Sequence, residues 1–524
     1  EGTAYSIDIQ QGGSITVLPK GGLTVHAGGF TEASEQNLTI HNMQSGAGFI
    51  RISPYFTREV EGTMPKAKVL YQTKSTLDTG ANKDATWQYI GAPGTDCSIY
   101  VDYNTRLYKL DEPNADWVLQ PRTANVALEP FEGYAITQYG QPTYQWTAQL
   151  TNQSPTLPLT YSKAGRSGRH IFANSFTAPI DVKALDGLIT YHEGEQDRFR
   201  IEQTVYIFNS GSWNAWNTKP QMGDDTPGQY YAIPILAAAA DYLADEQTVI
   251  PPMQGFYMRV RSRIPTSELS ATENVGQILL DYNKLVMGNQ HELNTPLRLP
   301  QRVEETPDFQ RVRMYATSAN SGADRLYVIQ DTINTRKYNN GYDAPNQETK
   351  GLVNIYTNES FGKMEVSCSD NIDSLYIGFM AGEDSNYTLH FGALCGEIYL
   401  KDLENDSIFL MQDGGQYNFT ATPNSTNDLR FQILLNPDID PFPGNGDINS
   451  SINNIPSMQV WMDDNTIYIA NAPINSVATL FNISGHAILT TPIHYTPYSL
   501  NLSHMPQGVY VLKINNEAYK FVCK

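Results

Sequence analysis

Short runs in which hydrophobic and polar residues alternate recur along most of the chain. Runs of about four to eight such residues, bounded by Gly, Pro, Asn or Asp, are typical of β-strands, because successive side chains of a strand face opposite sides of a sheet. Examples are residues 107–112, 205–209, 325–329, 387–391 and 466–470. One stretch, residues 235–243, is rich in Ala and Leu instead and predicts a short helix.

The first 60 residues contain the shortest runs. Residues 13–25 hold brief alternating strands separated by Gly and Pro, and residues 37–40 add another. This stepping is typical of parallel β-solenoid coils, in which each turn of the chain adds one strand to a sheet. Two coils are too few to stand alone, so residues 1–60 are predicted to be a solenoid-like end or cap.

Two segments within residues 61–312 repeat a common order of motifs. The first copy begins its series of motifs with Trp87 and has Gly133 in its last motif. The second copy has His170 in its first motif and Gly255 in its last. The separation of the copies grows from 83 residues (Trp87 to His170) to 122 residues (Gly133 to Gly255). An insertion near residues 219–246 accounts for the increase. We therefore predict two β-rich copies, at about residues 61–165 and 166–312.

The remaining chain divides into three parts. Residues 313–436 show closely spaced alternating strands and predict a β-sandwich. Residues 437–456 are mostly Pro, Gly, Asn and Asp and predict a linker. Residues 457–524 alternate again and predict a small β-sandwich. The predicted fold class is all-β, with several β-sandwich domains in tandem and a short β-solenoid-like N-terminal segment.

Composition narrows the function. The 524 residues include 35 Lys and Arg against 55 Asp and Glu, giving a net charge of −20. Hydrophobic residues make up 40%, which excludes disorder of the whole chain, and charged residues only 17% against a typical value of about 25%. Such a composition favours an extracellular β protein. Without a basic cluster in the sequence, binding to nucleic acid or to anionic lipid is not expected.

The longest apolar stretch is too short to cross a membrane. Residues 233–243 are interrupted by Pro234 and Asp241, whereas a spanning helix needs about 20 apolar residues. The first residues show no charged region followed by an apolar one. We therefore expect that a signal peptide has been removed or lies upstream in a longer precursor.

The four cysteines do not form a recognisable site. Cys97, Cys368, Cys395 and Cys523 include no pair with the C-x-x-C spacing of zinc or redox sites. Cys368 and Cys395 lie in strand-like segments of one predicted domain. A disulfide between them and two free thiols both remain open.

The last block resembles the C-terminal sorting domain of proteins exported through the type IX secretion system of certain Gram-negative bacteria. The matching phrases are residues 481–485, 500–502, 505–511 and 519–524. Cys523 departs from the family, which more often has an aliphatic or small residue there. The resemblance implies the secretion machinery as a partner and assigns the sorting signal to Gly485, Gly508, Tyr510, Lys520 and Lys524.

The upstream chain resembles large surface proteins of the same secretion class. These proteins carry a Gly-rich solenoid end, here residues 45–48, and repeated phrases such as residues 87–93. The second copy has His170 where the family usually has Trp. Members are mostly uncharacterised or described as adhesins. The resemblance covers nearly the whole chain and implies a secreted or outer-surface location.

The motifs of the common enzyme classes do not occur in the sequence. His192 and His291 each lack the second His, four residues later, of a zinc protease helix. Acidic neighbours at residues 224–225, 304–305 and 463–464 are interpreted as solvated turns, because a glycosidase needs its carboxylates at a defined separation across a cleft. The acidic residues 438–447 lack the spacing of an EF-hand loop and are interpreted as linker. We expect no catalytic residues, metal or cofactor.

Three tryptophans are the candidate binding residues. Trp117, Trp213 and Trp216 offer flat aromatic faces that stack on sugar rings. Aromatic residues at strand spacing more often fill a core, and Trp213 and Trp216 would face opposite sides of one strand. The sequence predicts a non-enzymatic binding or adhesion protein, with a host glycan or extracellular protein as partner. The alternatives are a hydrolase with dispersed catalytic residues and a structural stalk or scaffold.

Overall fold

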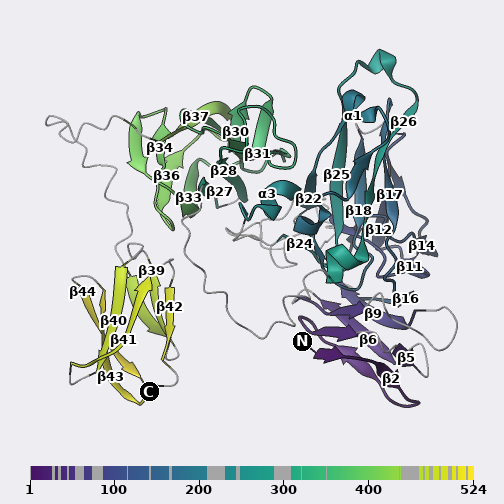
Figure 1. The fold of residues 1–524 in the computed structure, drawn as a ribbon, viewed down its shortest axis with the longest axis horizontal. Coiled ribbons are helices and arrows are strands. Elements are labelled where there is room, and N and C mark those ends of the chain that lie inside the picture. Colours follow the sequence, from purple (N-terminus) through teal and green to yellow (C-terminus); the bar gives the residue numbers. More distant parts are fainter. Residues whose placement is uncertain are drawn as a thin grey trace.

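The protein is described here from a computed structural model, and its fold is all-β, as the sequence pattern predicts (Figure 1). The helical segments are short: η1 (Val182–Leu185), α1 (Glu195–Arg198), α3 (Ile235–Ala239), η2 (Thr266–Glu268) and η3 (Asn283–Met287). α3 lies within the stretch predicted to be helical. The structure describes residues 2–25, 30–32, 37–43, 46–52, 64–73, 87–114, 116–140, 143–164, 168–208, 230–243, 248–287, 309–319, 321–349, 351–435, 437, 459–463, 466–470, 476–482, 485–493, 498–502, 505–514 and 517–523.

The N-terminal strands pair in parallel from one turn of the chain to the next. The first sheet contains β1 (Gly2–Ala4), β4 (Gly22–Val25) and β8 (Phe49–Ile52), the second contains β2 (Ile7–Ile9) and β5 (Phe30–Glu32), and the third contains β3 (Ile15–Val17), β6 (Leu38–Met43) and β9 (Lys66–Gln72). A short strand, β7 (Gly46–Ala47), pairs with β6. Aliphatic side chains such as Val17, Val25 and Ile50 are buried in one core with the first copy. The classification of this end as a solenoid stays a prediction.

The two copies have the same order of strands. The first has a four-stranded sheet, β10-β15-β12-β13, and a pair, β11-β14; the second has β18-β25-β22-β23 and β19-β24. The strands of the first copy are β10 (Gln88–Ile90), β11 (Cys97–Val101), β12 (Thr105–Asp111), β13 (Asp116–Leu119), β14 (Ala124–Leu128), β15 (Tyr134–Gln138) and β16 (Thr143–Gln149), which pairs with β9. Those of the second are β17 (Thr156–Ser162), β18 (Arg169–Ala173), β19 (Ile180–Asp181), β20 (Ile189–Tyr191), β21 (Phe199–Ile201), β22 (Thr204–Phe208), β23 (Tyr230–Pro234), β24 (Val249–Ile250), β25 (Gly255–Ser262) and β26 (Thr272–Leu279). The predicted boundaries between the copies stay predictions.

Backbone groups of the two copies bond to each other reciprocally. The amide of Gly91 donates to the carbonyl of Met253 at 3.0 Å, and the amide of Ala173 donates to the carbonyl of Phe131 at 2.9 Å. Gly91 and Ala173 are 82 residues apart, and Phe131 and Met253 are 122 residues apart. If the two copies are exchanged, Gly91 takes the place of Ala173 and Met253 that of Phe131, so one hydrogen bond becomes the other. The copies are therefore related by an approximate two-fold exchange.

Strand register identifies the equivalent residues of the two copies. Ala135 of β15 pairs with Tyr89 of β10. Its counterpart 122 residues later, Tyr257 of β25, pairs with Ile171 of β18. Tyr89 and Ile171 are 82 residues apart, one fewer than the motif comparison predicts.

This register changes the counterpart of Trp87. The equivalent residue in the second copy is Arg169, whereas the motif order aligned Trp87 with His170. Motif comparison matches residue types, but backbone pairing sets which side chains share a face, and a shift of one residue turns each side chain to the other side of the sheet.

Two glycines allow the copies to approach each other. A Cβ atom on Gly133 would lie 2.4 Å from Cγ2 of Ile171, and one on Gly255 would lie 2.6 Å from Cβ of Tyr89. Non-bonded carbon atoms do not approach this closely, so a side chain at either glycine would push the copies apart. The glycines that end the two motif series thus form the seam between the copies.

The next domain is one long sheet that folds around a core. Its strand order is β35-β34-β37-β32-β30-β31-β28-β27-β33-β36, and β29 pairs with β31. The bounds are β27 (Gln310–Thr317), β28 (Ala323–Gln330), β29 (Ala344–Pro345), β30 (Asn354–Glu359), β31 (Gly362–Ser369), β32 (Tyr376–Met380), β33 (Asn386–Cys395), β34 (Tyr399–Asp402), β35 (Ser407–Leu410), β36 (Gln416–Thr420) and β37 (Thr426–Leu434). The two ends of the sheet meet, because the rings of Phe409 and Tyr417 stack 4.6 Å apart. The sheet thus curves around its core, and the β-sandwich that the sequence predicts for residues 313–436 stays a prediction.

A shared core and a buried ion pair join this sandwich to the second copy. Tyr327 and Val366 are fully buried in the same cluster as the aromatic residues of β22 and β25. Arg325 lies 3.1 Å from Glu365 and donates to the carbonyl of Ala232 at 2.9 Å, while Glu365 accepts from the amide of Ala232. Because the partners satisfy one another, burying this charged pair leaves no orphaned carboxylate.

The C-terminal block folds as a small sandwich with its own core. One sheet has the order β38-β39-β42 and the other β41-β40-β43-β44. Their bounds are β38 (Gln459–Asp463), β39 (Thr466–Ala470), β40 (Ser476–Asn482), β41 (Ala487–Ile493), β42 (Tyr498–Asn501), β43 (Gly508–Ile514) and β44 (Glu517–Cys523). Ile469, Leu480 and Leu512 are among the buried residues between the sheets. The predicted linker, residues 437–456, lies outside the described residues except for residue 437.

The cysteines whose side chains are described are free thiols. Cys97, Cys368 and Cys395 form no disulfide, so the pairing that the sequence left open is not formed. The thiol of Cys368 donates to the carbonyl of Tyr342 at 3.4 Å, and that of Cys395 to the carbonyl of Phe309 at 3.2 Å. Among the helices that the structure describes, none is long and apolar enough to span a membrane.

Candidate binding site

The structure places one of the three predicted binding residues. Trp213 and Trp216 lie outside the described residues. Trp117 lies half-buried on β13, the edge strand of the first copy, where it pairs with Leu110 of β12.

Trp117 lines a pocket that has a small residue between two tyrosines. Ala135 of β15 pairs with Tyr89 on one side and with Tyr108 on the other. Because Ala135 carries only a methyl group, a space of about 400 Å³ remains beside it. We call this space the aromatic pocket; it is lined by Trp87, Tyr89, Tyr108, Trp117, Ala135 and Phe208.

The rings of the aromatic pocket are held by one another. Trp117 stacks on Tyr89 with 6.0 Å between ring centroids and 23° between planes, and Trp87 meets Tyr108 edge-on at 5.5 Å. Phe208 comes from the second copy and lies 5.3 Å from Tyr89. The pocket therefore spans the seam and presents flat apolar walls of the kind that bind sugar faces or apolar side chains.

A hydroxyl pair lies next to these rings. The hydroxyl of Tyr89 is 2.8 Å from that of Tyr230, and burial raises the pKa of both groups. Both tyrosines thus stay neutral near pH 7. The apolar surface therefore adjoins hydroxyl groups that can donate or accept a hydrogen bond.

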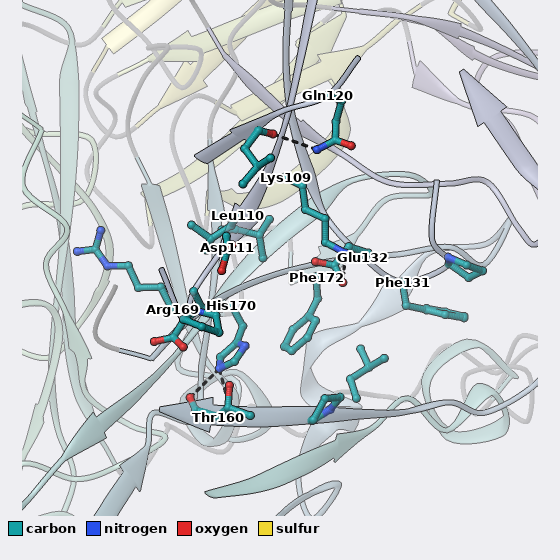
Figure 2. A pocket seen from close by; sticks show the side chains of 17 residues that line it. Lys109, Leu110, Asp111, Gln120, Phe131, Glu132, Thr160, Arg169, His170 and Phe172 are labelled. Carbon is teal, nitrogen blue, oxygen red and sulfur yellow. Dashed lines mark hydrogen bonds and ion pairs between the residues drawn. The ribbon is translucent and has the colours of Figure 1, made fainter. Parts of the chain in front are cut away.

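A second, more polar pocket of about 420 Å³ contains a histidine held by the backbone (Figure 2). His170 places Nε2 at 2.9 Å from the carbonyl oxygen of Thr160, and Figure 2 shows both contacts to Thr160 as dashed lines. Burial lowers the pKa of His170, so the ring is neutral near pH 7. Through Nε2, His170 therefore links β18 to Thr160 of β17.

The carboxylates of the polar pocket also have partners. Glu132 lies 3.6 Å from Nζ of Lys109, and burial raises the pKa of Glu132 while Lys109 offsets part of the rise. Glu112 accepts hydrogen bonds from the amides of Gly168 at 3.0 Å and Ser162 at 3.3 Å. These contacts fix the chain around the pocket.

The acidic neighbours considered for hydrolysis fall mostly outside the described residues. This holds for residues 224–225 and 304–305 and for Asp464. In the part of the chain that the structure describes, no group of three or more His, Cys, Asp or Glu is placed to hold a metal ion.

The predicted sorting residues lie at strand ends and on the last hairpin of the C-terminal sandwich. Gly485 has a positive φ of 77° in the turn between β40 and β41, which favours glycine. Gly508 begins β43, and the buried Tyr510 donates from its hydroxyl to the carbonyl of Pro506 at 2.6 Å. Lys520 is exposed on β44, and Lys524 lies outside the described residues. Their role in sorting stays a prediction.

Sequence reasoning missed most walls of the aromatic pocket. Tyr89, Tyr108 and Phe208 lie in strand-like runs that the sequence identifies, but their meeting depends on the strand order β10-β15-β12 and on contact between copies. The small Ala135 among large β-residues is the one local signal that indicates a hollow.

Comparison with known proteins identifies the C-terminal sandwich. Residues 463–524 match the family described as secretion system C-terminal sorting domain. The chain is a type IX-sorted protein of the secreted or outer-surface class. The resemblance given by the sequence is confirmed, and the sorting domain makes the type IX machinery a partner of the chain.

The chain is also similar to a fimbrium subunit. The chain is 28% identical over 388 residues to the minor fimbrium subunit Mfa5 of Porphyromonas gingivalis, covering 70% of this chain and 30% of that protein. A solved structure of a biofilm associated protein, BSP domain, aligns over 87% of this chain and 96% of its own with 9% identity and a TM-score of 0.11, which carries no argument about the fold.

Proposed function

We propose that this protein is a non-enzymatic adhesin that binds its partner at the aromatic pocket. The observation that supports the proposal most is the pocket itself, in which Trp117, Tyr89 and Tyr108 surround the small Ala135. The sorting domain brings this pocket to the outside of the cell. A host glycan or an extracellular protein is the proposed partner, since both offer apolar faces bordered by hydroxyl or amide groups.

A second candidate is a subunit of a fimbrial assembly. The similarity to a minor fimbrium subunit favours it, although the chain spans only 30% of that relative. In this case the partner is another subunit, and the apolar walls of the pocket serve assembly. Adhesin and subunit are compatible roles for one chain.

A binding screen tests the proposal. The 524-residue chain is applied to arrays of glycans and extracellular proteins, beside Trp117→Ala, which removes a wall, and Ala135→Leu, which fills the hollow. We expect a saturable ligand whose affinity falls about tenfold or more in both variants, as for loss of a central aromatic contact.

A matched control separates the pocket from aromatic surface in general. Tyr100 is 56% exposed on β11, in the other sheet of the same copy. Tyr100→Ala should leave binding unchanged. No saturable ligand on any array, or equal losses in Tyr100→Ala and Trp117→Ala, would rule out the aromatic pocket as the adhesive site.

A further inference from the structure

Four arginines gather in a pocket between the second copy and the β-sandwich. The space is about 420 Å³, within the range of sites for small ligands. Its charged lining consists of five cations and one carboxylate, in a chain whose net charge is −20. We call it the arginine pocket; its charged residues are Arg169, Arg200, Arg259, Arg261, Lys363 and Glu348.

Strand pairing sets these arginines opposite one another. Arg169 of β18 pairs with Arg259 of β25, and Arg200 of β21 pairs with Arg261 of β25. Like charges directly opposite each other in a sheet destabilise it. The fold does not require an arginine at the position of Arg259, since Thr137 occupies that position in the first copy.

Neighbouring groups neutralise part of this charge. Arg261 forms an ion pair with the buried Glu202, and the guanidinium of Arg200 lies 3.9 Å from the centre of the Tyr338 ring. Lys363 lies 2.8 Å from Glu348 and 3.3 Å from Asp428. Arg169 is exposed, and its guanidinium is 5.9 Å from the ring centre of its neighbour Tyr257. Cations thus outnumber carboxylates among the residues that line the pocket.

A smaller cavity connects the arginine pocket with the aromatic pocket. Its space is about 220 Å³. It shares Arg169 and Gln347 with the arginine pocket, and Tyr89 and Trp117 with the aromatic pocket. We take these three neighbouring spaces together as one groove, with aromatic rings at one end and guanidinium groups at the other.

We propose that this groove binds an acidic saccharide, with the carboxylate or sulfate groups of the saccharide at the arginine pocket. Guanidinium groups bind both anions through paired hydrogen bonds, which ammonium groups do not provide. A sugar ring next to the acidic group would stack on the aromatic walls. This inference deepens the proposed function and rests on it for the aromatic end of the groove.

A saccharide fits the groove better than an acidic peptide does. The lining also contains aromatic rings, Tyr338 and Phe361, and amide side chains, Asn346 and Gln347. Sugar rings likewise combine apolar faces with hydroxyl groups that hydrogen-bond to amides. A peptide of acidic residues offers charge without faces to stack.

Titration calorimetry on the 524-residue chain tests the proposal. The probes are a heparin octasaccharide, which carries sulfate and uronate, an octagalacturonate, which carries carboxylate alone, a neutral maltooctaose and an octaglutamate peptide. We expect at least one acidic saccharide to bind saturably and maltooctaose and octaglutamate not to bind. The pair of acidic probes distinguishes sulfate from carboxylate.

Two variants connect binding to the arginines. Arg169→Gln and the double variant Arg169→Gln/Arg259→Gln should lower the affinity for the acidic saccharide by about tenfold or more, because charged hydrogen bonds are lost. Arg122→Gln changes an exposed arginine beyond β13 that does not line the groove, and it should change the affinity by less than about twofold, as expected for a screened charge without direct contact. Thermal melting verifies that each variant is folded.

Several outcomes would overturn the inference. The first is that neither acidic saccharide binds, and the second is that octaglutamate binds instead of them. The third is that the double variant retains its affinity for the saccharide, and the fourth is that Arg122→Gln loses as much affinity as the double variant. The proposed adhesin function would survive each of these results if the arrays still gave a ligand sensitive to Trp117→Ala. The two proposals therefore fail separately.

Discussion

The two copies share one arrangement of strands and differ in the chemistry of equivalent faces. In the first copy, Trp87 and Ala135 leave a hollow among rings. In the second, the same positions hold Arg169 and Tyr257, so the space beside them is smaller, about 220 Å³, and a guanidinium lies on the surface. The backbone decides where a face lies, and a few side chains decide what it can bind.

The comparison also separates stability from function. Aromatic side chains in the first copy gain stability from burial and from ring contacts. The paired arginines in the second copy reduce stability, since like charges oppose each other across the strands. The pair of Arg169 and Arg259 is absent from the first copy, where Trp87 and Thr137 stand, and a costly feature of this kind is typical of a binding site.

The largest effect is expected from removing the sorting domain. Deleting residues 458–524 should leave both copies folded, because the C-terminal core is separate from theirs, and should stop export across the outer membrane. Surface labelling and fractionation check this. Wild-type amounts at the surface of the deletion strain would contradict it.

The seam between the copies gives the next largest effect. Gly133→Ala and Gly255→Ala should each lower the free energy of unfolding by about 2–3 kcal/mol, since the new methyl group overlaps the other copy. The two losses should be similar, because the contacts are reciprocal.

A third glycine is the control for the seam. Gly140 has a φ of 74° and no neighbour within 4 Å of an added Cβ, so Gly140→Ala costs only backbone strain of about 1 kcal/mol. Denaturant unfolding measures all three variants. An equal loss at all three positions would show that the seam is not tightly packed.

Local patterns predict the strands well and the site poorly. Alternation identifies strands such as β22 and β28, and turn residues separate the sandwiches, because these signals act over a few residues. The C-terminal phrases identify the sorting domain for the same reason.

The aromatic pocket depends on contacts far apart in sequence. Phe208 reaches Tyr89 across the seam, 119 residues away, and nothing local indicates this contact. The pairing of Arg169 with Arg259 likewise depends on strand register, which motif comparison placed one residue away. Trp117 was predicted from its residue type alone.

Exchanging one residue between the copies gives a smaller effect. Ala135→Tyr gives the first copy the residue of the second and should fill the aromatic pocket. The affinity for any ligand there should fall by about tenfold, while the free energy of unfolding should change by less than about 1.5 kcal/mol. Ala127→Tyr, at an exposed position of β14, is the matched control and should leave binding unchanged. Undiminished binding to Ala135→Tyr would place the ligand elsewhere.

The smallest effect is expected from relieving one pair of like charges. Arg169→Gln should raise the free energy of unfolding by about 0.5 kcal/mol, because Arg259 then faces a neutral partner. The gain should shrink as salt screens the repulsion. A loss of stability in low salt would mean that Arg169 is retained for packing rather than for binding.

The most direct test measures one acidic oligosaccharide against both ends of the groove. Calorimetric titration of the heparin octasaccharide would compare the unchanged chain with Trp117→Ala and with Arg169→Gln. If the aromatic and arginine pockets act as one groove, each variant should lower the affinity for this octasaccharide by about tenfold. Binding that is lost in Arg169→Gln but unchanged in Trp117→Ala, or unchanged in both, would contradict a shared groove.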